Sequence, residues 1–233
     1  MKLQVCSYIA VGVLAAGSSA ASAAISIQPL ATGDADFLAL TNNGALERAV
    51  SEGRIGNNAD NGTWEQAIWE PQGGVGSPVA QAQLPGFTSG ATVPFSISYD
   101  GAASISYTFG SSTLTWNLID GPFTDLFIRV RATSTSTAGL SNMFLDLPGA
   151  GEDTLIPDLT TGPAGTAEYL RLTRVGADFP AFTISGSSTF SWTGAVPANS
   201  ALAYQVKFSN VVPAPGALAI FALAGLTSRR RRA

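Results

Sequence analysis

The stretch "VPFSISYDGAASISYTFG", from Val93 to Gly110, alternates apolar and polar side chains on either side of one turn. Residues at every second position of a β-strand share a face, so each half of the stretch has one apolar face. Asp100-Gly101 lies between the halves, and an Asp-Gly pair flanked by such alternation is a strong signal of a β-hairpin. The stretch therefore predicts two antiparallel strands whose core-facing residues are Val93, Phe95, Ile97, Tyr99, Ile105, Tyr107 and Phe109.

The same alternation recurs along most of the chain. Further strand-like segments follow at intervals of about ten residues, separated by Gly, Pro, Asp or Ser. They cover residues 112–119, 124–137, 167–175, 181–194 and 201–212. Trp116 and Trp192 occupy alternating positions in two of them, so we expect both in the core. The spacing predicts an all-β fold, an antiparallel β-sandwich of jelly-roll-like type.

One segment predicts a helix instead. In "NNGALERAVSEG", from Asn42 to Gly53, Leu46, Ala49 and Val50 would lie on one side of a helix of two or three turns. Glu47 and Arg48 would then be exposed to solvent.

The composition narrows the function classes. Only 12% of the 233 residues are charged, and the chain has 25 glycines and 13 prolines, which is typical of a β-rich exported domain. It contains no histidine, and its single cysteine is Cys6. Thiol nucleophiles, Ser-His-Asp triads and histidine metal sites are therefore excluded from the body of the chain. We expect no catalytic residue, no bound metal and no cofactor, with structural calcium as the one alternative.

The first residues have the pattern of a secretory signal peptide. Lys2 supplies a positive charge, residues 5–16 are an apolar run, and Ala21 and Ala23 form an A-x-A cleavage signal. The apolar run is too short to span about 30 Å of hydrocarbon. We expect cleavage before Ala24, which would remove a signal helix together with Cys6 and leave no thiol or disulfide.

The last residues combine an apolar segment with a basic end. The segment from Val211 to Leu226 is of marginal length for a stable membrane-spanning helix. Arg229, Arg230, Arg231 and Arg232 follow it, and the positive-inside rule places them on the cytoplasmic side as a stop-transfer signal. This pattern predicts a transmembrane sorting helix that anchors the protein only transiently.

The tail "VPAPGALAIFALAGLTSRRRR" resembles the C-terminal sorting signal of PEP-CTERM proteins. That family has a short proline-flanked motif, a hydrophobic helix and a basic end, in this order. Here the motif consists of Val212, Pro213, Ala214, Pro215 and Gly216, with Ala214 in place of the family's central glutamate. The resemblance implies an exosortase as a partner during export and transient residence in the inner membrane, while the N-terminal signal implies signal peptidase.

Without Lys2 and the four tail arginines, the body of the chain is strongly acidic. Seven of the 12 basic residues remain against 16 acidic ones, a net charge of about −9. Binding to phosphate backbones requires a basic face, so nucleic acid is not an expected partner.

Several residues are candidates for ligand contact. In a strand, Trp64 would share a face with Ile68, and Trp69 would lie on the opposite face. One of the two tryptophans could then be exposed and is a candidate for stacking on a sugar. Glu65 with Glu70, and Glu152 with Asp153, are the candidate carboxylate pairs of a glycosidase, although each lies beside Gly, Asn or Pro, where solvated turn residues are the default explanation. "GDAD" (33–36) and "NNADNG" (57–62) offer oxygen ligands for calcium or, alternatively, tight turns.

The body of the chain has a second resemblance. "GRIGNNADNGTWEQAI", "VPFSISYDG", "LTWNLID" and "FTDLFIRVRAT" are similar to the choice-of-anchor W domain, a family of exported bacterial domains with interchangeable anchors. This resemblance assigns no catalytic residues. We divide the chain into a signal peptide (1–23), a β-sandwich domain (24–210) and a sorting tail (211–233).

Three functions follow as hypotheses. The preferred one is a non-enzymatic cell-surface or extracellular-matrix protein, exported through the inner membrane and associated with exopolysaccharide or biofilm. The second is a carbohydrate-binding module on the same scaffold, and the third is a glycoside hydrolase that uses carboxylates alone.

Overall fold

The structure is a computed structural model, and it describes most of the chain between Ala24 and Val211. The described residues are 24–42, 46–55, 64–71, 78–84, 86–117, 119, 121–133, 135–148, 153–161, 166–197 and 202–211. The expected signal peptide, the residues of the tail from 212 onward, and the calcium candidate at 57–62 lie outside them. Among the described residues, no helix has the length and apolar character that crossing a membrane requires.

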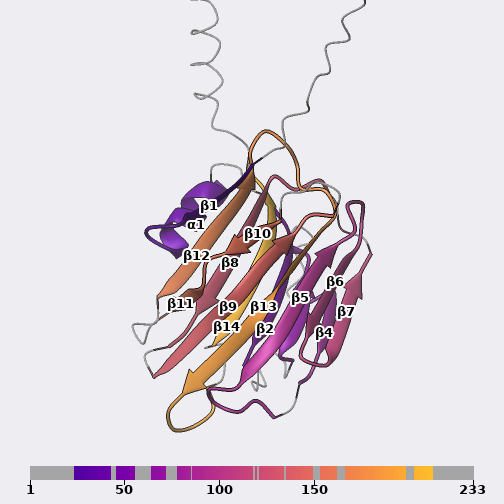
Figure 1. Ribbon diagram of the computed structural model, residues 1–233. Coiled ribbons are helices and arrows are strands. Elements are labelled where there is room, and N and C mark those ends of the chain that lie inside the picture. The colour runs from indigo at the N-terminus through magenta and orange to yellow at the C-terminus, as the bar shows by residue number, and fades with distance from the viewer. Residues whose placement is uncertain are drawn as a thin grey trace, which may run out of the picture.

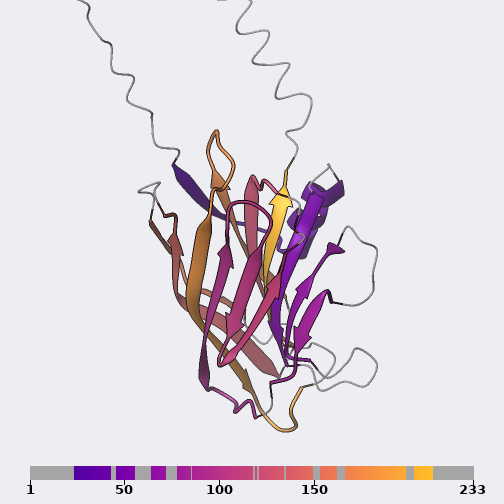
Figure 2. The same ribbon diagram turned by 90° about the vertical axis from the view of Figure 1, so that its right-hand side faces the viewer.

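Two antiparallel β-sheets make up this part of the chain, as the sequence predicts (Figures 1 and 2). Sheet A has the strand order β1-β12-β8-β14-β2-β3-β4, and sheet B has the order β10-β9-β13-β5-β6-β7, with β11 also paired to β9. The elements are β1 (Ile25–Pro29), α1 (Asp34–Asn42), β2 (Leu46–Arg54), β3 (Gln66–Trp69), β4 (Ala80–Ala82), β5 (Thr92–Tyr99), β6 (Ile105–Phe109), β7 (Ser112–Trp116), β8 (Asp125–Arg131), β9 (Ser136–Asp146), β10 (Thr154–Ile156), β11 (Leu159–Thr161), β12 (Ala167–Arg174), β13 (Phe182–Trp192) and β14 (Ala203–Asn210). The prediction of an all-β sandwich is therefore confirmed.

The hairpin predicted at Asp100-Gly101 joins β5 to β6. Its two strands pair from Phe95 opposite Phe109 to Tyr99 opposite Ile105. Gly101 has a φ of 84°, which a residue without a Cβ adopts at little cost. One Asp100 carboxylate oxygen accepts three backbone N–H groups from the turn, which fixes the tight reversal. The two residue types that signalled the hairpin therefore each have a physical role in it.

The core lies between the sheets and is rich in aromatic rings. Tyr204 of β14 contacts Phe95, Phe109 and Phe190 of sheet B, with ring centroids 5.0 to 6.2 Å apart. Its hydroxyl hydrogen-bonds the Tyr107 hydroxyl at 2.7 Å across the core. Burial raises the pKa of both hydroxyls, so this pair stays neutral at any physiological pH. Trp116 and Trp192 are half-buried and pack against the same core, as predicted.

The helix predicted over residues 42–53 is wrong, because residues 46–53 belong to strand β2. Its side chains do not alternate cleanly, since the register with β14 shifts beside Arg48 and a bulge interrupts the period of two. The inward positions of β2 carry the small residues Ala49, Ser51 and Gly53, which leave room for the rings of the facing layer. Because of the bulge and the small inward residues, the apolar residues of β2 are spaced as on one face of a helix, which explains the wrong prediction. Glu47 is partly buried and bonds Lys207 at 2.9 Å rather than facing open solvent.

The one helix of the described residues, α1, lies immediately before that segment. It begins after Gly33, whose φ is 55°, and the Asp36 carboxylate accepts the Thr32 backbone N–H at its entrance. Asp34 and Asp36 in the first turn also interact favourably with the helix dipole. Phe37 packs α1 onto the outer side of sheet A, against Phe127 and Tyr169, with centroids 5.2 Å apart. Figure 1 shows α1 beside β1 and β12.

The two ends of the described chain leave the sandwich from the same end of sheet A. The backbone N–H of Val175 donates to the carbonyl of Ala24, just before β1. The backbone N–H of Val211, just after β14, donates to the hydroxyl of Thr124. Ile25 of β1 pairs with the last residue of β12, and the residue before that one pairs with Asp125 of β8, which in turn pairs with Ser209 of β14. The two ends therefore lie on neighbouring cross-strand rows. Three strand spacings of about 4.8 Å separate β1 from β14. Figure 2 shows the start of β1 and the tip of β14 at this same end.

Candidate functional site

Of the candidate sugar-stacking residues, Trp64 lies just before β3 of sheet A and Trp69 is the last residue of that strand. Their rings meet edge to face with centroids 5.3 Å apart. Trp64 is only 4% exposed, and the Arg54 guanidinium lies 3.1 Å from the centre of its ring. The Arg54 Nε–H also donates to the Trp64 backbone carbonyl at 3.0 Å. The ring of Trp64 is therefore occupied by an arginine, and Trp69 is the half-buried member of the pair.

Arg54 is the centre of a buried charge cluster that the sequence did not predict. It is 3% exposed, and the carboxylates of Glu52 and Glu65, themselves 6% and 2% exposed, attract its charge. Burial raises the pKa of Glu52 despite a hydrogen bond from the Gln205 amide at 2.9 Å and the nearby cations. Burying any one of these charges without its partners would cost several kcal/mol of folding free energy, so removing one member should destabilise the others.

We expect the titration of Glu52 to affect the stability of the fold. A carboxyl whose pKa is raised in the folded state contributes stability below its ordinary value of 4.5, and this is lost as pH rises through the raised pKa. Glu52→Gln keeps an oxygen to accept the Gln205 amide but cannot ionise. Urea unfolding at several pH values between about 4 and 7 should show the variant gaining stability relative to the native chain as pH rises. A difference that stays constant with pH would contradict this assignment.

The structure does not bring the candidate glycosidase carboxylates together. Glu65 precedes β3 and Glu70 follows it, so their Cα atoms are about 16 Å apart at roughly 3.3 Å per residue. Paired carboxylates of glycosidases lie about 5 to 10 Å apart. The Glu65 carboxylate also accepts the Leu84 backbone N–H at 2.7 Å, which is a structural role. Asp153 accepts the Leu147 N–H, and its expected partner Glu152 lies outside the described residues.

The calcium candidate at residues 33–36 forms the start of α1. Asp34 is held by Arg129 at 3.2 Å and by the Tyr169 hydroxyl at 2.7 Å. Burial alone would raise the pKa of Asp34, but these hydrogen bonds outweigh it, and the net pKa is lowered. Both aspartates of this segment therefore have protein partners, and the described residues contain no group of three metal-ligating side chains.

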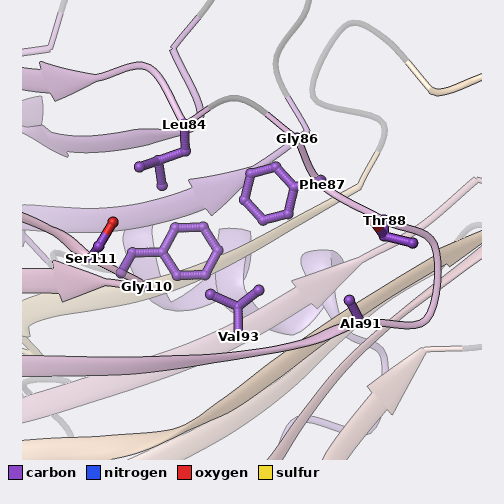
Figure 3. A pocket seen from close by; sticks show the side chains of 9 residues that line it. Leu84, Gly86, Phe87, Thr88, Ala91, Val93, Gly110 and Ser111 are labelled. Carbon is purple, nitrogen blue, oxygen red and sulfur yellow. The ribbon is translucent and has the colours of Figure 1, made fainter.

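Away from α1, an apolar hollow of about 200 Å³ opens between the loop before β5 and the turn between β6 and β7 (Figure 3). Leu84, Phe87 and Val93 turn toward it, and Phe87 stacks on Phe109 at 5.5 Å. Thr88 and Ser111 supply the only hydroxyls among its lining residues. No lining residue can act as an acid or a base, so this hollow can hold an apolar group but cannot catalyse proton transfer.

Sequence patterns miss both Arg54 and Phe87 because neither belongs to a motif. Arg54 reaches Trp64 across ten residues, and the loop that carries Phe87 is placed by contacts with distant strands. The only local signal is the apolar Phe87 in a loop rich in Gly and Ser. No protein-family model matches this chain, and a search of the curated proteins found no match either. What the molecule does is therefore inferred from its own residues.

Proposed function

We propose that the chain is an exported bacterial cell-surface or extracellular-matrix protein that an exosortase sorts through its C-terminal tail. The sandwich is the cargo, with jelly-roll-like character, and it acts without catalysis in association with extracellular polysaccharide. Signal peptidase, the exosortase and the inner membrane are its partners during export.

One observation carries this proposal: the order of motif, apolar segment and arginines in residues 212–232. The geometry is compatible with it, since Val211, from which the tail continues, lies at the same end of sheet A as Ala24. A processing enzyme at the membrane would meet this end of the sandwich, while the apolar hollow of Figure 3 lies at the opposite end, near Tyr204.

The contacts of the basic residues support the exclusion of nucleic acid. Arg129 pairs with Asp34, Arg171 with Asp125 at 2.7 Å, and Lys207 with Glu47 at 2.9 Å. Arg54 is buried on Trp64. These cations are neutralised within the fold, so they do not form the free basic face that phosphate binding needs.

The intact mass of the exported protein tests the proposal at both ends of the chain. We expect a product that begins at Ala24 and lacks the four arginines of the tail. In a strain without its exosortase, the chain should retain Arg229 to Arg232 and accumulate in the inner membrane. Replacing Pro213 and Pro215 with alanine should reproduce that accumulation in the normal strain, since it alters the motif and leaves the apolar segment intact. Tail-bearing protein in the medium of both strains would overturn the proposal.

A further inference from the structure

The outer face of sheet B carries a set of unpaired hydroxyl groups. They lie on neighbouring strands in three cross-strand rows, in which Ser185 faces Ser96, Ser187 faces Ser141 and Ser191 faces Thr137. All are half-buried, and none of their hydroxyls bonds another group of the described chain. We call this surface the hydroxyl face; its members are Ser96, Thr137, Ser141, Ser185, Ser187 and Ser191.

A hollow of about 190 Å³ lies at one edge of the hydroxyl face, where β11 joins β9. Thr137, Ser141 and Thr160 line it together with the carboxylate of Asp158. One oxygen of Asp158 accepts the backbone N–H of Asn142 at 3.1 Å, which fixes the carboxylate in place. A fixed carboxylate is a strong acceptor for hydroxyl donors, because bonds to an ionised acceptor are stronger than neutral ones.

Apolar side chains complete this surface. Phe144 lies on the outer side of β9, since its neighbours Met143 and Leu145 face the core. Leu155 of β10 is paired with it and is 77% exposed. A sugar ring presents hydroxyls at its rim and C–H groups on its faces, so it matches a surface that combines a ring, hydroxyls and a carboxylate.

The distribution of charge limits which polymer can bind here. Every lysine and arginine between residues 24 and 211 lies on β2, β8, β12 or β14, which are strands of sheet A. Sheet B has none, while Asp146 and Asp158 lie at the edge of its outer face. A polymer with carboxylate, sulfate or phosphate groups would meet repulsion without compensation. The surface is complementary to a neutral polyhydroxylated chain.

We propose that the hydroxyl face and the hollow at Asp158 bind a neutral polysaccharide. This inference rests on the proposed extracellular location, and it assigns the polysaccharide contact to sheet B rather than to Trp64 and Trp69. One row joins β13 to β5 and the other two join β13 to β9, so together they give an extended chain several hydroxyl contacts. The hollow holds one sugar unit, whose hydroxyls donate to Asp158.

Affinity electrophoresis of the exported protein tests this proposal directly. Native gels would contain dextran, xyloglucan or galactomannan as neutral probes, and alginate as the anionic one. We expect at least one neutral probe to retard the native protein and alginate to leave it unretarded. Ser141→Arg places a long side chain in the hollow and should weaken binding about tenfold or more. Asp158→Asn keeps the acceptor for Asn142 and removes the charge, so binding should weaken while the fold persists.

A matched control is available on the other sheet. Ser26 of β1 is also half-buried, and Ser26→Arg changes the net charge by the same amount, so it should bind as the native protein does. Thermal unfolding of each variant confirms that it is folded. The proposal is overturned if none of the neutral probes retards the protein, if alginate alone does, or if Ser141→Arg binds normally. It is also overturned if sedimentation shows a dimer that Ser141→Arg dissociates, because the face would then bind a second copy. Processing of the tail, read by intact mass, is independent of each of these outcomes.

Discussion

Replacing Gly53 with alanine is expected to destabilise the sandwich by about 3 kcal/mol, although alanine is normally the better strand residue. A Cβ at position 53 would lie 2.5 Å from a ring carbon of Tyr204 and 2.8 Å from the Tyr107 hydroxyl. Both side chains are fully buried and bonded to each other, so neither can move aside cheaply. The new methyl group would displace a ring from the core or break the hydrogen bond between the tyrosines.

Thermal and urea unfolding measure this loss, and for a domain of this size we expect Tm to fall by about 6 to 12 °C. Gly139→Ala is a suitable control, because the nearest atom to its Cβ would be the Thr160 hydroxyl at 3.3 Å, and the Leu159 carbonyl at 3.9 Å is an ordinary contact. It should change stability by less than about 1 kcal/mol. Tyr204→Leu should cost less in the Gly53→Ala background than in the native chain, since it also relieves the clash with the Tyr204 ring. Equal effects at positions 53 and 139 would contradict the packing described for β2.

Replacing Arg54 with methionine should cost about 3 to 5 kcal/mol, the usual penalty for removing one member of a buried charge cluster. Methionine fills a similar volume over Trp64 but provides no charge. Glu52 and Glu65 would then remain buried without the cation that attracts both of them. The main loss comes from these two carboxylates rather than from the contact with the tryptophan ring.

A matched variant shows whether the loss in Arg54→Met comes from the burial of the charge or from the loss of any arginine on this sheet. Arg131 lies on the same row of sheet A, with Ala203 of β14 between it and Arg54, but its side chain is exposed. Arg131→Met should therefore change the free energy of unfolding by less than about 1 kcal/mol. Adding Glu52→Gln to Arg54→Met should restore stability in part, because one uncompensated charge is then gone. If the double variant is no more stable than Arg54→Met, the carboxylates are not the source of the loss.

Strands with uninterrupted alternation could be predicted from the sequence. β5, β6 and β14 are of this kind, and in each of them residues at every second position face the core. β2 and β9 could not be predicted in the same way. A register shift beside Arg48 interrupts β2, and Asn142, with a φ of 51°, breaks the alternation in β9. The remaining missed strands, β1, β3, β4, β10 and β11, have only three to five residues each, too few for an alternating pattern to stand out.

The candidate site illustrates the same limit. The sequence shows that Trp64 and Trp69 differ in direction, but not which of them is covered, because the cover comes from Arg54 on another strand. The hydroxyl face depends on pairing between β9 and β13, which places Ser141 opposite Ser187 across 46 positions of sequence. Serines and threonines are common in single strands and do not by themselves predict a binding surface. The surface exists only because strand pairing places them side by side.

The position of β14 determines how the sandwich would respond to a mechanical load. Val211 continues from β14, which lies between β8 and β2 inside sheet A and is paired on both sides along its length. A pull on this end acts along the strand and perpendicular to its hydrogen bonds, so both ladders are sheared and their bonds resist together. The same pull on an edge strand such as β4 would open a single ladder. Force applied to the chain at Val211 would therefore have to break the bonds of both ladders together before β14 could leave the sheet.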